Sequence, residues 1–150
     1  MKTECAPRAM GVEDIKTEAI DCKRLRLEPL STMHADALYA MVIASADLHE
    51  YTHIPEDYTL EYAREWVARK SSEPYFYAIT DRTTGEVVGV ISAVHFDVLS
   101  RNAEVGFWLG RQYRGRGYAE EALAAFVEAV FERTPIAKIH GRVFPDNEAS

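Results

Sequence analysis

Glu104-Val105-Gly106-Phe107-Trp108-Leu109-Gly110 is followed by Arg111-Gln112-Tyr113-Arg114-Gly115-Arg116-Gly117-Tyr118-Ala119, and then by an alanine-rich amphipathic run that reaches Phe131. This order predicts an apolar strand, a short basic loop with two glycines, and a helix that begins at the loop. The first amides of a helix have no carbonyl partner within it, and the helix dipole places partial positive charge at the same end. The junction is therefore typical of a site for a phosphate.

Several classes of phosphate-binding protein use such a junction. A dinucleotide-binding fingerprint would need a third glycine where Glu120 stands, and a P-loop would need Lys followed by Ser or Thr. The pattern that remains is Gln112-x-x-Gly115-x-Gly117. It resembles the acetyl-CoA pyrophosphate loop of the GNAT family of N-acetyltransferases, and residues 103–110 resemble the ribosomal-protein N-terminal acetyltransferase (RimJ/RimL-like) branch. The alternative is an ordinary glycine-rich turn at the start of a helix.

The composition argues against several classes of protein. The 150 residues are enough for one domain, and 47% hydrophobic with 27% charged residues is ordinary for a soluble globular chain. There is no apolar run of membrane-spanning length, and Cys5 and Cys22 lack zinc-ligand spacing. We therefore expect a cytoplasmic protein without a metal site or a membrane partner. The net charge of −7 argues against nucleic-acid binding and is compatible with a cationic amine substrate.

The rest of the chain predicts strands and helices on both sides of the loop. Residues 1–22 lack periodicity and are expected to form a loose N-terminal extension before a domain over residues 23–150. Alternation and β-branched or aromatic content predict strands over residues 23–29, 74–80, 86–96, 104–110 and 138–143. Besides the helix after the loop, one helix capped by Ser31 or Thr32 is expected to end near Ser45, and another is expected to be capped by Thr59. Residues 48–58 read as a loop, residues 81–85 as a hairpin turn, and Gly89 as a bulge or a close backbone approach.

The resemblance covers about residues 23–150 and implies an α+β fold, with a mixed, mostly antiparallel sheet and helices on both faces. In the family, an Asn-x-x-Ser motif after the corresponding last strand opens a helix, and two more strands follow. Here Asn147-Glu148-Ala149-Ser150 matches that motif at the end of the sequence. We therefore expect a domain that is incomplete at its C-terminus, without the last helix and two strands, so that the strand over residues 138–143 forms a sheet edge.

The resemblance also implies how the co-substrate acetyl-CoA is held. Backbone groups of Phe107, Trp108 and Leu109 would pair with its pantetheine arm, and one of these amides would polarise the thioester carbonyl. Loop and helix amides would bind the pyrophosphate. The complete set of cofactor-binding candidates is Phe107, Trp108, Leu109, Gln112, Tyr113, Arg114, Gly115, Arg116, Gly117, Tyr118, Ala119 and Asn147. As side chains, Phe107 and Trp108 are also explained by packing in the sheet.

Two residues are catalytic candidates. Glu104 lies where several family members carry the general base that deprotonates the amine, and its alternative is a structural hydrogen-bonding role. Ser150 matches the serine that would protonate the leaving thiolate. A base matters less for an α-amine, whose pKa is about 7.7–8.0, than for a lysine amine, whose pKa is roughly 2.5 units higher.

Other reactive side chains carry weaker hypotheses. His49, His53, His95 and His140 show no compact metal-ligand spacing, so solvent-facing or hydrogen-bonded histidines are the simpler interpretation. Tyr51, His53 and Tyr58 lie in the loop that lines the acceptor cleft in relatives. Nothing near Cys22 in the sequence would activate it as an acyl-carrying nucleophile.

Together these features predict direct acetyl transfer from acetyl-CoA to a primary amine, without a covalent acyl-enzyme. The first acceptor to consider is the N-terminal amine of a protein, and the second is a small-molecule amine. Two other classes stay open: a CoA-binding module without turnover, and a nucleotide-binding domain in which ATP or NAD competes with CoA. The oligomeric state is also open, a homodimer included.

Overall fold

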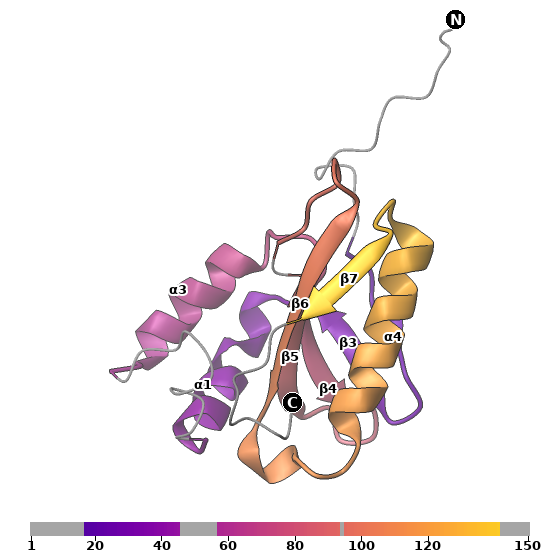
Figure 1. Ribbon diagram of the computed structural model, residues 1–150. Coiled ribbons are helices and arrows are strands. Elements are labelled where there is room, and N and C mark those ends of the chain that lie inside the picture. Colours follow the sequence, from indigo (N-terminus) through magenta and orange to yellow (C-terminus); the bar gives the residue numbers. More distant parts are fainter. Residues whose placement is uncertain (1–16, 46–56, 94, 142–150) are drawn as a thin grey trace, which may run out of the picture.

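The computed structural model describes residues 17–45, 57–93 and 95–141, which form one twisted sheet with helices packed against it (Figure 1). The sheet has six strands in the order β2-β3-β4-β5-β6-β7. Their bounds are Ile20–Asp21 (β2), Leu25–Pro29 (β3), Phe76–Asp81 (β4), Val87–Ala93 (β5), Asn102–Leu109 (β6) and Lys138–Gly141 (β7). All neighbouring strands are antiparallel except β6 and β7, which are parallel.

Helices cover both faces of this sheet in the part of the chain that the structure describes. Helices α1 (Ala35–Ile43) and α3 (Leu60–Lys70) lie on one side, and α4 (Tyr118–Arg133) lies on the other (Figure 1). The predicted fold class, a mixed and mostly antiparallel sheet with helices on both faces, is confirmed. No described helix has the length and apolar character that crossing a membrane requires.

Alternation along β4 builds a separate core on each face. Tyr77 and Ile79 point toward α4, where they pack with Phe126, while Phe76 and Ala78 point toward Val67 and its neighbours on α1 and α3. Successive strand residues face opposite sides of a sheet, so one aromatic strand can supply two cores when both faces are covered. The aromatic content that predicted this strand therefore serves both layers.

Gly89 in β5 lies at a close contact between strands. The register of β4 and β5 shifts next to it, between Ile79 and Thr80, which is a β-bulge. A Cβ at position 89 would lie 2.2 Å from the carbonyl oxygen of Trp108 on β6. Only glycine allows this approach. Both parts of the sequence-based interpretation, a bulge and a close backbone approach, are present.

The starts of two helices can be compared with the capping residues that the sequence predicts. The Thr59 hydroxyl accepts a hydrogen bond from the amide of Tyr62 at 3.0 Å, as predicted for a capping residue. The other predicted helix begins with a 3₁₀ turn, η2 (Thr32–His34), after Ser31. There the amide of Ser31 donates to Nδ1 of His34. Most of the predicted loop over residues 48–58 lies outside the described residues.

Residues just before the first predicted strand also contact the sheet. β2 pairs with β3 through Ile20↔Leu27, and Ile20 is buried. The hydroxyl of Thr17 accepts from the amide of Tyr75, and the carbonyl of Glu18 accepts from the Tyr77 hydroxyl. Within the predicted extension over residues 1–22, the described residues 17–22 therefore pack against the domain. Residues 1–16 lie outside the description.

Candidate functional site

The basic loop after β6 has a tight and defined path. A 3₁₀ turn, η3 (Arg111–Tyr113), begins at Gly110, and the Tyr113 amide donates to the Gly110 carbonyl at 2.9 Å. Gly115 and Gly117 then adopt φ values of 76° and 80°, in the left-handed region that favours glycine. Gly117 is the N-cap of α4. The two glycines that suggested a ligand-binding loop are therefore required by its backbone path.

The loop is attached to α1 and to the end of its own strand. A Cβ at Gly110 would lie 2.5 Å from Cγ of Met41, so α1 contacts the loop closely, and the Arg111 amide donates to Oγ of Ser45. Two nitrogens of the Arg114 guanidinium donate to the Leu109 carbonyl, at 3.1 and 2.9 Å. These contacts hold the loop to the body of the domain.

The start of α4 presents amides without a helical partner. Among the described residues, the first α4 amide that donates to a helix-type carbonyl is that of Glu121, to Gly117 at 3.1 Å. The amides from Gly117 to Glu120 precede that bond, and this is the end that carries the positive pole of the helix dipole. With the exposed Arg111 and Arg116 nearby, the junction can bind a phosphate group through backbone N–H groups and cations together.

The three candidate pantetheine-binding residues end β6. On one side they pair with β5 through Leu109↔Gly89, Trp108↔Val90 and Phe107↔Ile91. On the other side, the described pairing with β7 runs from Asn102↔Lys138 to Val105↔Gly141. The side chains of Phe107 and Trp108 pack against the cores on opposite faces, so packing explains them as side chains.

Glu104 lies in the same strand, before these residues. Its exposed fraction is 9%, and its Oε1 lies 3.7 Å from Nε2 of His140 on β7. The parallel register places the two residues opposite each other, as Glu104↔His140. His140 had no predicted role beside Glu104, because no local sequence pattern reveals which residue a parallel crossover brings alongside. A buried carboxylate beside an imidazole can accept a proton and pass it on.

The remaining candidates separate into described and undescribed residues. Asn147, Ser150, Tyr51, His49 and His53 lie outside the described residues. Tyr58 stacks on Tyr39 with ring centroids 5.7 Å apart, and burial raises the pKa of Tyr58 to about 12. Burial, followed by the charge of Glu121, raises the pKa of the Cys22 thiol to about 11, which agrees with its interpretation as an unreactive thiol. In the described ranges no three metal-ligating side chains come together.

Comparison with known proteins shows which family this chain belongs to. A family model described as an acetyltransferase (GNAT) domain matches residues 24–150. The chain belongs to the GNAT acetyltransferase family. It is therefore an acyltransferase of the N-acetyltransferase type, and the GNAT resemblance drawn from the loop residues is confirmed.

Similar proteins share the GNAT fold over most of their length. The chain is 25% identical over 138 residues to an uncharacterized N-acetyltransferase named p20 from Bacillus licheniformis, covering 89% of this chain and 77% of that protein. The structure of the RimL ribosomal-protein alpha-N-acetyltransferase in complex with coenzyme A superposes with a TM-score of 0.79 at 24% identity, covering 88% of this chain and 78% of that one. The acetyltransferase MccE in complex with acetyl-CoA and AMP has a TM-score of 0.76 at 16% identity, covering 84% and 73%.

The residues at the junction fit an acetyl-CoA pyrophosphate. The ligand carries two linked phosphates, and the loop supplies two left-handed glycines and the amides that begin α4. A side chain at Gly115 or Gly117 would strain the backbone at these φ values, so the path of the loop requires glycine at both positions.

Proposed function

We propose that this GNAT acyltransferase moves the acetyl group of acetyl-CoA directly to a primary amine, and that its first acceptor is the N-terminal α-amine of a protein. The main support for acetyl-CoA as the donor is the junction of β6, the glycine loop and α4, where amides lie at the positive end of the helix. Of the predicted stretch from Gln112 through Ala119, we assign the pyrophosphate to the amides from Gly115 onward, because the Tyr113 and Arg114 amides donate to the Gly110 and Arg111 carbonyls. Backbone groups of Phe107, Trp108 and Leu109 pair with the pantetheine arm.

Each remaining step has a candidate residue. The amine nitrogen attacks the thioester carbonyl carbon, so that a C–N bond forms, the C–S bond breaks, and the amine loses one proton. Glu104 accepts that proton, directly or through a water, and a β6 amide donates to the carbonyl oxygen. Ser150, by its match to the family motif, returns a proton to the thiolate. Support for Glu104 comes from its burial beside His140 on the strand that leads to the loop.

Other observations support an N-terminal α-amine as the acceptor. Residues 103–110 resemble the RimJ/RimL-like branch, and a RimL alpha-N-acetyltransferase is among the similar folds. The acidic net charge of −7 also suits a cationic amine. An α-amine is the acceptor that demands least from a base, because its pKa of about 7.7–8.0 leaves about a tenth of it neutral at pH 7. A cytoplasmic location remains a prediction from composition.

Binding measurements test first whether acetyl-CoA is the donor. We expect calorimetric titration with acetyl-CoA to show saturable binding, and titration with ATP to show none of comparable affinity. ATP or NAD binding in competition with CoA would instead favour the nucleotide-binding alternative.

Turnover measurements test whether the acceptor is an N-terminal α-amine. With acetyl-CoA present, we expect thiol release with peptides that have a free N-terminus, and little release when the same peptides are N-terminally blocked but retain a lysine. Mass spectrometry should place the acetyl group on the α-nitrogen. Release with small amines alone would favour a small-molecule acceptor, while CoA binding without any release would favour the binding-module alternative.

A further inference from the structure

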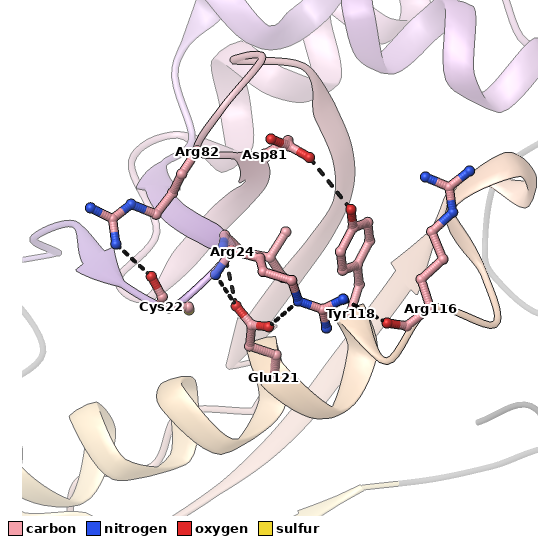
Figure 2. A network of polar contacts seen from close by, with 8 residues as sticks. Cys22, Arg24, Asp81, Arg82, Arg116, Tyr118 and Glu121 are labelled. Atoms are coloured by element: carbon pink, nitrogen blue, oxygen red, sulfur yellow. Dashed lines mark hydrogen bonds and ion pairs between the residues drawn. The ribbon is translucent and has the colours of Figure 1, made fainter.

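A cluster of polar contacts lies next to the loop, where the start of β3 meets the start of α4. At its centre is Arg24, which directly precedes β3 (Figure 2). Its Nε donates to Oε1 of Glu121 at 2.7 Å, and its Nη1 donates to the Arg116 carbonyl at 2.8 Å. One guanidinium group therefore joins the first turn of α4 to the loop.

Neighbouring groups fix the orientation of this guanidinium. The amides of Arg24 and Leu25 both donate to Oε2 of Glu121, at 2.7 and 3.1 Å. The guanidinium carbon lies 4.7 Å from the centre of the Tyr118 ring, a cation–π distance. The Tyr118 hydroxyl in turn lies 3.4 Å from a carboxylate oxygen of Asp81 in β4. A guanidinium held on two sides by hydrogen bonds and on one face by a ring has little freedom to turn.

The contact with the Arg116 carbonyl has a consequence for the loop amides. A trans peptide unit is planar, and its C=O and N–H groups point in opposite directions. The described peptides are all trans. Because the Arg116 carbonyl points toward Arg24, the Gly117 N–H of the same peptide points away from Arg24. Figure 2 shows the carbonyl facing Arg24 while the Arg116 side chain extends away from Arg24.

The cluster also balances a charge. Glu121 places a carboxylate in the first turn of α4, close to the helix end that would receive phosphates. An unbalanced carboxylate there would repel an anionic ligand. The contact with Arg24, at 2.7 Å, pairs that charge on the β3 side of the helix.

We propose that Arg24 is a positioning residue for the pyrophosphate loop: it orients the Arg116–Gly117 peptide and neutralises Glu121, so that the amides at the start of α4 face the phosphates of the donor. The inference rests on the acetyl-CoA site of the proposed function and is independent of the acceptor. Arg24 acts through the peptide and the carboxylate, and none of its contacts described above is with the reacting atoms.

The test replaces Arg24 with methionine, which keeps the length of the side chain and removes the guanidinium. We expect Arg24→Met to weaken CoA binding about tenfold by calorimetry and to raise KM for acetyl-CoA by a similar factor, with kcat within about twofold, because a single charge-assisted contact is of this order. Arg26→Met is the matched control. Arg26 lies two residues further along, is equally exposed (45% against 44%), and pairs with Asp21, away from the loop.

A truncated acyl donor separates positioning from a general structural defect. S-acetyl-N-acetylcysteamine has the thioester but no phosphates, so we expect Arg24→Met to use it with wild-type kcat/KM. Loss with both donors would show a general defect and overturn the inference. Arg24→Lys keeps the charge but lacks the planar fork, so it should recover only part of the affinity. Full recovery would leave only the neutralisation of Glu121 and overturn the orienting role of the guanidinium.

Failure of this inference and failure of the proposed function give different results. If wild-type protein binds CoA and Arg24→Met binds it equally well, the inference fails and the proposed function stands. If folded wild-type protein does not bind CoA, the donor site fails and the inference fails with it.

Discussion

At the scale of single residues, the loop shows which sequence signals have a direct structural cause. Gly115 and Gly117 are needed for their positive φ values, and Gly110 for its contact with Met41. Two nitrogens of the Arg114 guanidinium donate to the Leu109 carbonyl, so this side chain also holds the loop to the end of its own strand. Spacing revealed the glycines, since backbone conformation limits residue type. The side-chain direction of Arg114 depends on the folded strand end and has no sequence signal.

Glu104→Gln tests the proposed base. With an α-amine acceptor, we expect kcat to fall at pH 7 by up to about tenfold, because about a tenth of such an amine is already neutral there, while the CoA dissociation constant stays unchanged. The deficit should shrink as pH rises past about 8, because the amine then loses its proton to solvent. Steady-state kinetics from pH 6 to 9 measures this.

The matched control is Glu128→Gln, which changes an exposed carboxylate on α4 and should leave the profile unchanged. A Glu104→Gln rate equal to wild type at every pH would assign Glu104 a purely structural role in β6.

At the scale of elements, α4 has two roles, one at its first turn and one along its buried face. Its first turn belongs to the proposed phosphate site, and its buried face packs Phe126 against Tyr77 of β4 and the preceding Tyr75, with ring centroids 6.1 and 6.3 Å apart. The 3–4 spacing of apolar residues predicted that face. The strand ends were less predictable: Tyr75, expected inside a strand, has φ of 55° and lies before β4. Tertiary contacts of Tyr75 outweigh its strand propensity.

Two phenylalanines of α4 allow a matched test of this packing. Phe126 is fully buried, and Phe126→Ala should lower the free energy of unfolding by about 3–5 kcal/mol through lost burial and a cavity. Phe131 is 44% exposed, and Phe131→Ala should cost about 1 kcal/mol or less. Urea unfolding followed by circular dichroism measures both. Equal losses would contradict the assignment of the buried face.

At the scale of the whole molecule, contacts between distant segments could not be predicted from local sequence patterns. Arg24 and Glu121 are 97 residues apart in sequence and make an ion pair at 2.7 Å. The fold class and the loop could be predicted because periodicity and glycine spacing are local properties. The Arg24 cluster and the Glu104–His140 pair could not, because they depend on strand order and on the register of a parallel crossover.

The pH dependence of stability is a whole-molecule consequence of this ion pair. Burial raises the pKa of Glu121, but hydrogen bonds from the Arg24 amide and guanidinium and from the Leu25 amide outweigh it, so that the pKa lies below its ordinary value of 4.5. A carboxyl with a lowered folded-state pKa stabilises the fold fully above its unfolded-state pKa, and this contribution is lost as pH falls through the folded-state pKa. Glu121→Gln should therefore be less stable than wild type at pH 7, and the difference should narrow below about pH 4.5.

Urea unfolding of wild type and Glu121→Gln at pH 7 and at pH 3 measures that difference. The exposed Glu128→Gln should match wild type at both values. A difference of the same size at pH 3 and at pH 7 would mean that the carboxylate charge of Glu121 contributes nothing to stability.

The strand order has a consequence for synthesis on the ribosome. From β2 to β7, each described strand lies next to the one made just before it, so every strand that emerges finds its partner already available. The sheet can grow at one edge as translation proceeds. The contact between Arg24 and Glu121 must instead wait until α4 has been translated, so the loop proposed to bind the pyrophosphate reaches its final shape only after β2 to β6 have been made.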